Sequence, residues 1–112
     1  MDEFYIDKVS LDHSDISHLL EESLSEGHRH IKRLFEEFAS GRNTFSNEGE
    51  ALFAAVINER IIGICGLNID PYVEGKHVGR VRRLYVSKKF RRHGIGRSLM
   101  QAVIQEAQNT IG

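Results

Sequence analysis

Cysteine, proline and tryptophan are scarce in this 112-residue sequence, which has one cysteine, one proline and no tryptophan. The lone Cys65 excludes an intramolecular disulfide and is typical of the reducing cytoplasm, where we expect the protein to act. The longest apolar runs, residues 51–57 and 61–67, are far too short to span a bilayer. The acidic N-terminus has no apolar core and does not resemble a signal peptide. We therefore expect no membrane partner.

Motifs for metals and for nucleoside triphosphates are missing as well. His28 and His30 are two residues apart at a predicted helix start, and no further Cys/His cluster has ligand spacing, so a surface role is favoured over a metal site. No Walker A pattern (GxxxxGK followed by Ser or Thr) occurs. Because no repeat, linker or low-complexity tract is visible, we expect one domain over residues 1–112.

The formal net charge of −1 hides an asymmetry along the chain. Residues 1–74 carry 6 Lys and Arg against 15 Asp and Glu, a balance of −9, whereas residues 75–112 carry 9 against 1, a balance of +8. This split indicates an anionic partner for the basic part, although that part could instead pack against the acidic half. The basic stretch 80–97 also contains Tyr85 and Phe90, as nucleic-acid binders do, but the pI of about 6.6 argues against such a binder.

Hydrophobic periodicity predicts a mixed α/β chain. The first strand is expected at residues 4–11, followed by helices at 16–24, with capping residues at 12–15, and at 29–39, ended by Gly27 and Gly41. Residues 51–57 and 61–69 form a predicted hairpin with a three-residue connection, and Asp70-Pro71 and Glu74-Gly75 mark a loop at 70–76. The next strand covers 77–86. Since Val81 and Leu84 are three apart, a β-bulge near Arg82-Arg83 would bring them to one face. The alternative is a regular strand in a sheet that is covered on both faces.

The stretch from Val81 to Ala107 reads as a strand, a basic glycine loop and an amphipathic helix. The loop is Arg91-Arg92-His93-Gly94-Ile95-Gly96. Glycine allows a close approach of the backbone to a ligand, and the first amides of a helix have no intrahelical partner. Together with the helix dipole, these features predict a phosphate-bearing ligand at the start of the helix. The apolar face of that helix contains Ile95, Leu99, Ala102, Val103 and Ala107.

At these residues the sequence resembles the GNAT superfamily of N-acetyltransferases. The acetyl-CoA signature of that family is Arg or Gln, two residues, Gly, one residue, then Gly or Ala, and it is matched by Arg91–Gly96. The preceding Leu84-Tyr85-Val86 and the following Leu99-Met100 also match, as does the order of strands and helices. The resemblance implies an α/β (α+β) fold, in which a central, mostly antiparallel sheet is flanked by helices.

The resemblance also implies a cofactor and a site. Backbone amides of residues 92–97, helped by the Ser98 hydroxyl, would hold the pyrophosphate of acetyl-CoA, and main-chain groups of residues 84–86 would bond its pantetheine arm. The implied reaction moves the acetyl group to a primary amine of unknown identity. The implied cofactor-binding residues are Leu84, Tyr85, Val86, Arg91, Arg92, His93, Gly94, Ile95, Gly96, Arg97 and Ser98.

The sequence departs from the family pattern in its catalytic groups. Family members continue with a further strand, a helix and a hairpin, which often carry the tyrosine that protonates the thiolate. Tyr5, Tyr72 and Tyr85 lie elsewhere, so we expect the chain to be the N-terminal portion of such a domain, lacking its C-terminal strands. Arg80, Arg82 and Arg83 stand on the strand where an acidic base is often found.

Catalytic residues are therefore unassigned. Glu74 and His77 could reach the cleft but are more typical of solvated loop positions. The alternative function is a non-catalytic module that binds CoA or oligomerises. Without a neighbouring strand, residues 77–86 would form an exposed sheet edge, for which we expect pairing with a second copy of the chain. Cys65, within a β-rich run, is expected to be a buried structural thiol.

Overall fold

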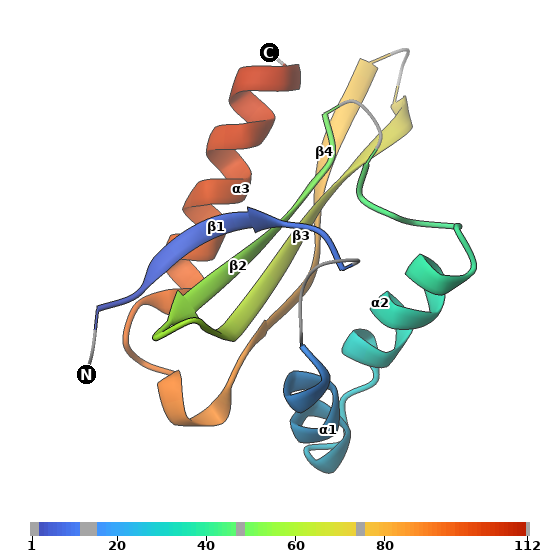
Figure 1. The fold of residues 1–112 in the computed structure, drawn as a ribbon. Coiled ribbons are helices and arrows are strands. Elements are labelled where there is room, and N and C mark those ends of the chain that lie inside the picture. The colour runs from blue at the N-terminus through green and yellow to red at the C-terminus, as the bar shows by residue number, and fades with distance from the viewer. Residues whose placement is uncertain (1–2, 12–15, 47–48, 74–75, 112) are drawn as a thin grey trace.

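The computed structural model describes residues 3–11, 16–46, 49–73 and 76–111. Figure 1 shows a central sheet with helices on both faces. In chain order the elements are β1 (Tyr5–Val9), α1 (Ser17–Ser25), α2 (His30–Ala39), β2 (Ala51–Ile57), β3 (Arg60–Val73), β4 (Lys76–Val86), the short 3₁₀ helix η1 (Lys88–Phe90) and α3 (Ile95–Ile111).

The sheet is antiparallel throughout its described strands, in the order β1-β2-β3-β4. Helix α3 lies across one face, and α1 and α2 lie across the other (Figure 1). This arrangement confirms the α/β fold class expected from the sequence. It also leaves β4 at one edge of the sheet and β1 at the other.

Two hydrophobic clusters hold the helices to the sheet. Strand β2 is buried along its whole length, and its side chains alternate between the clusters. Leu52, Ala54 and Val56 pack with α1 and α2, whereas Ala51, Phe53, Ala55 and Ile57 pack with α3. A continuous apolar run is therefore explained by a strand that has helices on both sides.

The helices follow the predicted patterns closely. Gly27 and Gly41 adopt positive φ angles of 84° and 78° just after α1 and α2, where a helix commonly ends in a left-handed residue. In α3, Ile95, Leu99 and Val103 are almost completely buried. The predicted capping residues 12–15 lie outside the described residues, and Ile16 occupies the N-cap position of α1.

The hairpin and the loop after it differ from expectation. The β2–β3 connection has two residues, not three, because Ile57 pairs with Arg60 across the turn. Asn58 and Glu59 both have positive φ, 49° and 67°, which is the geometry of a type I′ turn and matches the twist of the strands.

Strand β3 runs on through Pro71 to Val73, where a loop was expected. The strand continues because β4 supplies a partner backbone, with Asp70 paired to Val78 and Val73 to Lys76. The pairing is irregular between Asp70 and Val73, which accommodates a proline that has no N–H to donate. The predicted turn residues Glu74 and Gly75 lie outside the described residues.

The predicted bulge in β4 is confirmed. Ile64 pairs with Tyr85 and Gly66 with Arg82, so three steps along β4 match two along β3. Arg83 is the extra residue of the bulge, and its backbone has a left-handed φ of 63°. Val81 and Leu84 both lie near the α3 side of the sheet, and both are partly exposed, at 38% and 40%.

The single cysteine behaves as predicted. Cys65 is fully buried in the cluster beneath α3. Burial raises the pKa of its thiol to about 11, because the thiolate would lose its hydration. Cys65 is therefore a packing residue with little nucleophilic character.

Candidate functional site

The glycine loop connects the end of β4 to the start of α3. Arg92 and Gly94 adopt positive φ angles of 69° and 79°, and these reverse the chain direction in a short space. The amide of Ser98 donates to the carbonyl oxygen of Gly94 at 3.0 Å, so α3 begins immediately after Gly94. The N–H groups of Ile95, Gly96 and Arg97 therefore have no carbonyl within the helix to bind and can point at a ligand.

A cavity of about 470 Å³ lies in front of these amides. A Cβ atom added to Gly96 would point into free space, with the nearest other atom, Cγ2 of Val86, 3.9 Å away. The absence of a side chain at Gly96 therefore keeps the mouth of the cavity open to a bulky group. The cavity is lined by Val86, Phe90, Arg91, Arg92, Gly94, Ile95, Gly96 and Arg97.

The edge of β4 offers main-chain groups beside this cavity. The amide of Ser87 donates to the carbonyl oxygen of Ile62 in β3 at 2.8 Å. Because backbone groups alternate along an antiparallel strand, Tyr85 also faces β3, whereas Val86 and Leu84 face outward. In agreement, the carbonyl oxygen of Val86 accepts a hydrogen bond of 2.9 Å from Nε of Arg91. Of residues 84–86, only Leu84 and Val86 can thus offer main-chain groups to a ligand along the edge.

The side chains of Tyr85 and Arg91 turn toward α1 and meet at Glu26. The Arg91 guanidinium forms two hydrogen bonds to the Glu26 carboxylate, of 2.6 and 2.9 Å, and it lies 5.3 Å from the centre of the Tyr85 ring. The buried Tyr85 hydroxyl donates to the same carboxylate. These contacts join the end of α1 to the strand and the loop that form the cavity.

The contacts at this junction shift the pKa values of Glu26 and Tyr85 in opposite directions. Hydrogen bonds from Arg91 and then Tyr85 lower the pKa of Glu26 to about 2. Burial, followed by the hydrogen bond to Glu26, raises the pKa of Tyr85 well above its usual range. Glu26 is therefore ionised and Tyr85 neutral at physiological pH, which suits a structural junction.

A second glutamate of α1 holds the segment just before the loop. The Glu22 carboxylate accepts hydrogen bonds from the amide of Lys88, at 2.7 Å, and from the hydroxyl of Ser87, at 3.3 Å. Sequence analysis missed both Glu22 and Glu26, because the pairs are 59 to 66 residues apart along the chain. No local pattern connects residues at such a separation.

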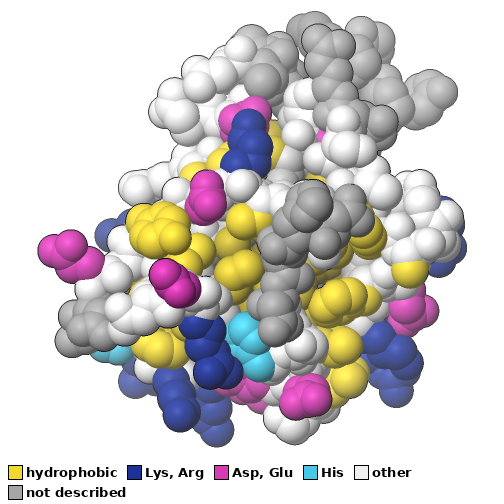
Figure 2. All heavy atoms as spheres, in the orientation of Figure 1, with side chains coloured by type: hydrophobic (Ala, Val, Ile, Leu, Met, Phe, Trp, Pro, Cys, Tyr) yellow, Lys and Arg dark blue, Asp and Glu magenta, His cyan; other side chains and the backbone are white. Residues whose placement is uncertain are grey.

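The other predicted site residues lie around the loop. The side chains of Arg92, His93 and Arg97 are exposed, Ile95 is buried beneath α3, and Ser98 is partly buried in the first turn of the helix. Figure 2 shows Lys and Arg side chains gathered at the lower left of the molecule, over η1 and the start of α3. The exposed cations of this region include Lys88, Lys89, Arg91, Arg92 and Arg97.

The described part of β4 carries no acidic side chain of its own beside the bulge. Arg83 forms an ion pair with Glu37 of α2 and is largely buried, and its Nε has no hydrogen-bond partner. The side chains of Glu74 and His77 lie outside the described residues. Among the residues that the structure describes, no cluster of three or more His, Cys, Asp or Glu side chains could hold a metal ion. Within the same residues, no helix has the length and apolar character needed to cross a membrane.

Solved structures with a similar fold are named as acetyltransferases. A proposed acetyltransferase from Exiguobacterium sp. 255-15 aligns with a TM-score of 0.82 and 27% identity, covering 97% of this chain and 72% of its own. Glucosamine-6-phosphate N-acetyltransferase from Arabidopsis thaliana aligns with a TM-score of 0.62 and 15% identity, covering 96% and 76%. Ribosomal-protein-alanine N-acetyltransferase from Brucella melitensis biovar Abortus 2308 aligns with a TM-score of 0.64 and 18% identity, covering 96% of this chain and 74% of its own.

The second and third similarities concern the fold alone, given their low identity. The sequence evidence is broader, because the model of the acetyltransferase (GNAT) family matches residues 14–112, which is most of the chain. The glycine loop, the edge of β4 and the start of α3 all fall inside that match. On this evidence, the chain belongs to the GNAT family of acetyltransferases.

Proposed function

We propose that the protein binds acetyl-CoA at the glycine loop and transfers the acetyl group to a primary amine. The observation that carries this proposal is the free first turn of α3 behind an open cavity, next to the outward-facing edge of β4. A pyrophosphate has the charge and the acceptor oxygens that such a helix start favours. The exposed side chains of Arg92 and Arg97 would add positive charge on either side.

The edge of β4 suits the extended arm of the same molecule. The pantetheine arm contains amide groups, which can pair with outward main-chain groups at Leu84 and Val86 as a further strand would. The bulge at Arg83 interrupts the regular pairing of β4 next to this segment. The carbonyl group of the bound acetyl thioester could accept a hydrogen bond from a main-chain amide there. When bound, acetyl-CoA would supply an activated acetyl group for attack by the acceptor amine.

A second candidate function is a module that binds CoA without chemistry. Arg83 favours this candidate, because it stands at the bulge, where a general base would be useful. Arg83 is a cation that forms an ion pair with Glu37, so it cannot act as that base. No described carboxylate lies on β4 beside the bulge, so the catalytic residues are unassigned. The two functions share the cofactor site and differ only in turnover.

Substitution of Gly96 tests the cofactor site itself. Gly96→Trp should fold normally, because the added Cβ meets no atom closer than 3.9 Å and the rest of the side chain can extend into the cavity. The bulky ring would then occupy the place of a pyrophosphate against the first turn. We expect CoA affinity, measured by titration calorimetry, to fall by about tenfold or more, which corresponds to ~1.4 kcal/mol.

Gln101→Trp is the matched control, since Gln101 is exposed on the same helix beyond the cavity. It should leave CoA affinity unchanged. Equal affinity in the wild type and Gly96→Trp would contradict the proposed site. Release of the CoA thiol with a panel of primary amines would then separate enzyme from module: CoA binding with no release favours the module.

We also propose that residues 1–112 belong to a single GNAT-like domain, that the protein acts in the cytoplasm without a nucleic-acid partner, and that two copies associate through the edge of β4. The pI of about 6.6 and the buried, unpaired Cys65 support the first part of this proposal. The second is supported by the position of β4 at the edge of the sheet and by the partly exposed Val81 and Leu84.

A further inference from the structure

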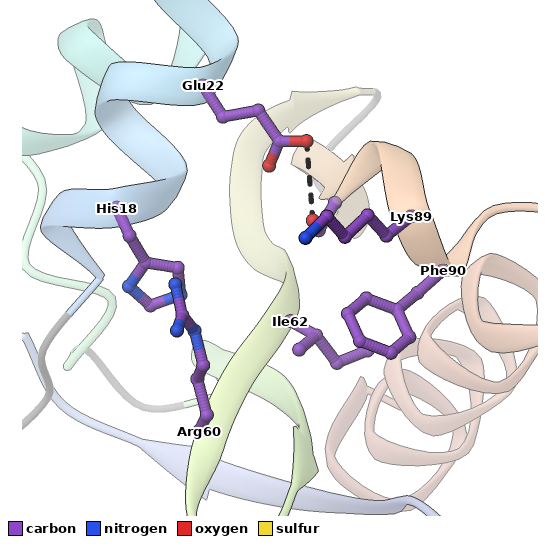
Figure 3. A pocket seen from close by; sticks show the side chains of 7 residues that line it. His18, Glu22, Arg60, Ile62, Lys89 and Phe90 are labelled. Carbon is purple, nitrogen blue, oxygen red and sulfur yellow. Dashed lines mark hydrogen bonds between the residues drawn. The ribbon is translucent and has the colours of Figure 1, made fainter. Parts of the chain in front are cut away.

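A second cavity, of about 440 Å³, lies on the other side of η1 from the glycine loop. It is enclosed by α1, the first residues of β3 and the segment that follows β4 (Figure 3). The two cavities have Phe90 in common and no other lining residue. The second cavity is therefore not a part of the proposed CoA site, and its size is within the usual range for small-molecule sites.

The floor of this cavity is apolar. Ile62 is almost fully buried, and the ring of Phe90 lies beside it (Figure 3). Such a surface favours the hydrocarbon part of a ligand, since its burial removes apolar area from water. A purely ionic ligand such as inorganic phosphate would leave this floor unused.

Cationic groups lie around that floor. Arg60 is the first residue of β3 and Lys89 belongs to η1, and both side chains are exposed and form no ion pair within the described residues. Figure 3 shows Arg60 and His18 on the side of the cavity opposite Phe90. Nε2 of His18 lies 2.6 Å from the carbonyl oxygen of Ile61, and because a carbonyl can only accept, Nε2 is the protonated nitrogen.

The one acidic group in the lining is already engaged. Oε1 of Glu22 accepts hydrogen bonds from the Lys88 amide and the Ser87 hydroxyl, which hold the carboxylate against η1. Two cations, an imidazole and one engaged carboxylate leave the lining with a net positive charge. An anion with an apolar body would complement both the charge and the floor.

We propose that this cavity is a binding site for a small organic carboxylate with an apolar body. The carboxylate lies near Arg60 and Lys89, and the apolar body covers Ile62 and Phe90. This site is independent of CoA binding and of acetyl transfer. It would give the protein a ligand that does not take part in the reaction.

Benzoate and benzamide are suitable probes, because they have the same ring and differ in charge. Titration of the full chain, followed by amide chemical shifts, should give saturable binding of benzoate with a Kd on the order of 1 mM. The shifts should centre on Ile62, Ser87 and Phe90. Benzamide should bind about tenfold more weakly, because it lacks the charge that Arg60 and Lys89 attract.

Variants identify the cavity. Arg60→Gln should weaken benzoate binding by about tenfold, and Arg60→Lys should retain most of it. Arg42→Gln removes an exposed arginine from the loop after α2 and serves as the matched control, with no change expected. Gly96→Trp, which tests the CoA site, should also leave benzoate binding unchanged.

Four results would overturn the inference. Three of them are the absence of saturable benzoate binding, equal affinity for benzoate and benzamide, and an equal effect of Arg60→Gln and Arg42→Gln. The fourth is competition between CoA and benzoate, since this would place benzoate in the glycine-loop cavity. Each of these outcomes leaves the CoA proposal open to its own test with Gly96→Trp.

Discussion

Glu26 connects three parts of the molecule through one carboxylate. It belongs to the end of α1, yet it accepts hydrogen bonds from Tyr85 of β4 and from Arg91 at the start of the glycine loop. The arginine of the family signature is thus used, within this chain, to anchor the loop to the helix. A charge-assisted, bidentate contact of this kind also fixes the direction of the loop.

Glu26 should also make stability depend on pH. Its pKa falls from an ordinary value of 4.5 to about 2 in the folded chain, so ionised Glu26 favours the folded state. Its contribution is fully present above pH 4.5 and is lost as the pH falls through about 2. The difference in unfolding free energy between wild type and Glu26→Gln should therefore be largest near neutral pH and shrink toward acid.

Denaturant unfolding at a series of pH values measures this difference. Glu21→Gln, which changes an exposed glutamate on the same helix, should give a profile close to that of the wild type. A Glu26→Gln difference that stays constant from neutral pH to pH 2 would show that the charge on Glu26 has no part in folding.

At the scale of elements, two short segments depend on left-handed backbone conformations. The β2–β3 turn places Asn58 and Glu59 at positive φ, and the glycine loop does so at Arg92 and Gly94. In the turn, asparagine tolerates the conformation well, but glutamate carries a Cβ that crowds the backbone. Within this turn, the strain therefore falls mainly on the exposed Glu59.

Glu59→Gly should relieve that strain. It creates the Asn-Gly pair that type I′ turns favour, and the relief outweighs the extra flexibility of the unfolded chain. We expect the free energy of unfolding to rise by about 0.5 kcal/mol. Glu21→Gly, the same change inside α1, should lower it by about 0.5–1 kcal/mol. Thermal unfolding of both variants would show the opposite signs, and a destabilised Glu59→Gly would contradict the turn geometry.

At the scale of the whole molecule, the two edge strands of the sheet are where association with a second copy is expected. Strand β4 has 11 residues and β1 only 5, so β4 offers the longer unpaired ladder. Beside β4 and α3 lies a groove of about 250 Å³, whose lining includes Leu67, Val81, Val103, Ile104 and Ala107. The bulge at Arg83 divides β4 in two. The proposed dimer would use residues 76–82, and the proposed cofactor would use the end of the strand.

Association through β4 can be tested at its exposed side chains. Val81→Lys should shift the protein from dimer to monomer in light scattering, because a charge at the edge opposes strand pairing. Tyr5→Lys on the opposite edge is the matched control and should leave the dimer intact. A wild-type monomer over a wide concentration range, or equal dissociation of both variants, would remove this part of the proposal.

Much of the fold can be predicted from the sequence, because the signals are local. Alternating or continuous apolar runs predicted β2 and β4, helical spacing predicted α1, α2 and α3, and Gly27 and Gly41 predicted where two helices end. Even the bulge followed from the spacing of Val81 and Leu84, since a side-chain period of two leaves few alternatives. The glycine loop before α3 was equally visible, as a helix start carries its own anion chemistry.

Only the tertiary structure decided how these parts meet. The extension of β3 through Pro71 depends on the opposing backbone of β4, and the junction at Glu26 depends on residues about 60 positions away. The second cavity depends on three segments from different parts of the chain. Sequence patterns report the environment of neighbouring residues, whereas contacts between distant segments arise when the chain packs. For this protein, the sequence alone determined the elements and the anion loop, and packing decided which groups face a ligand.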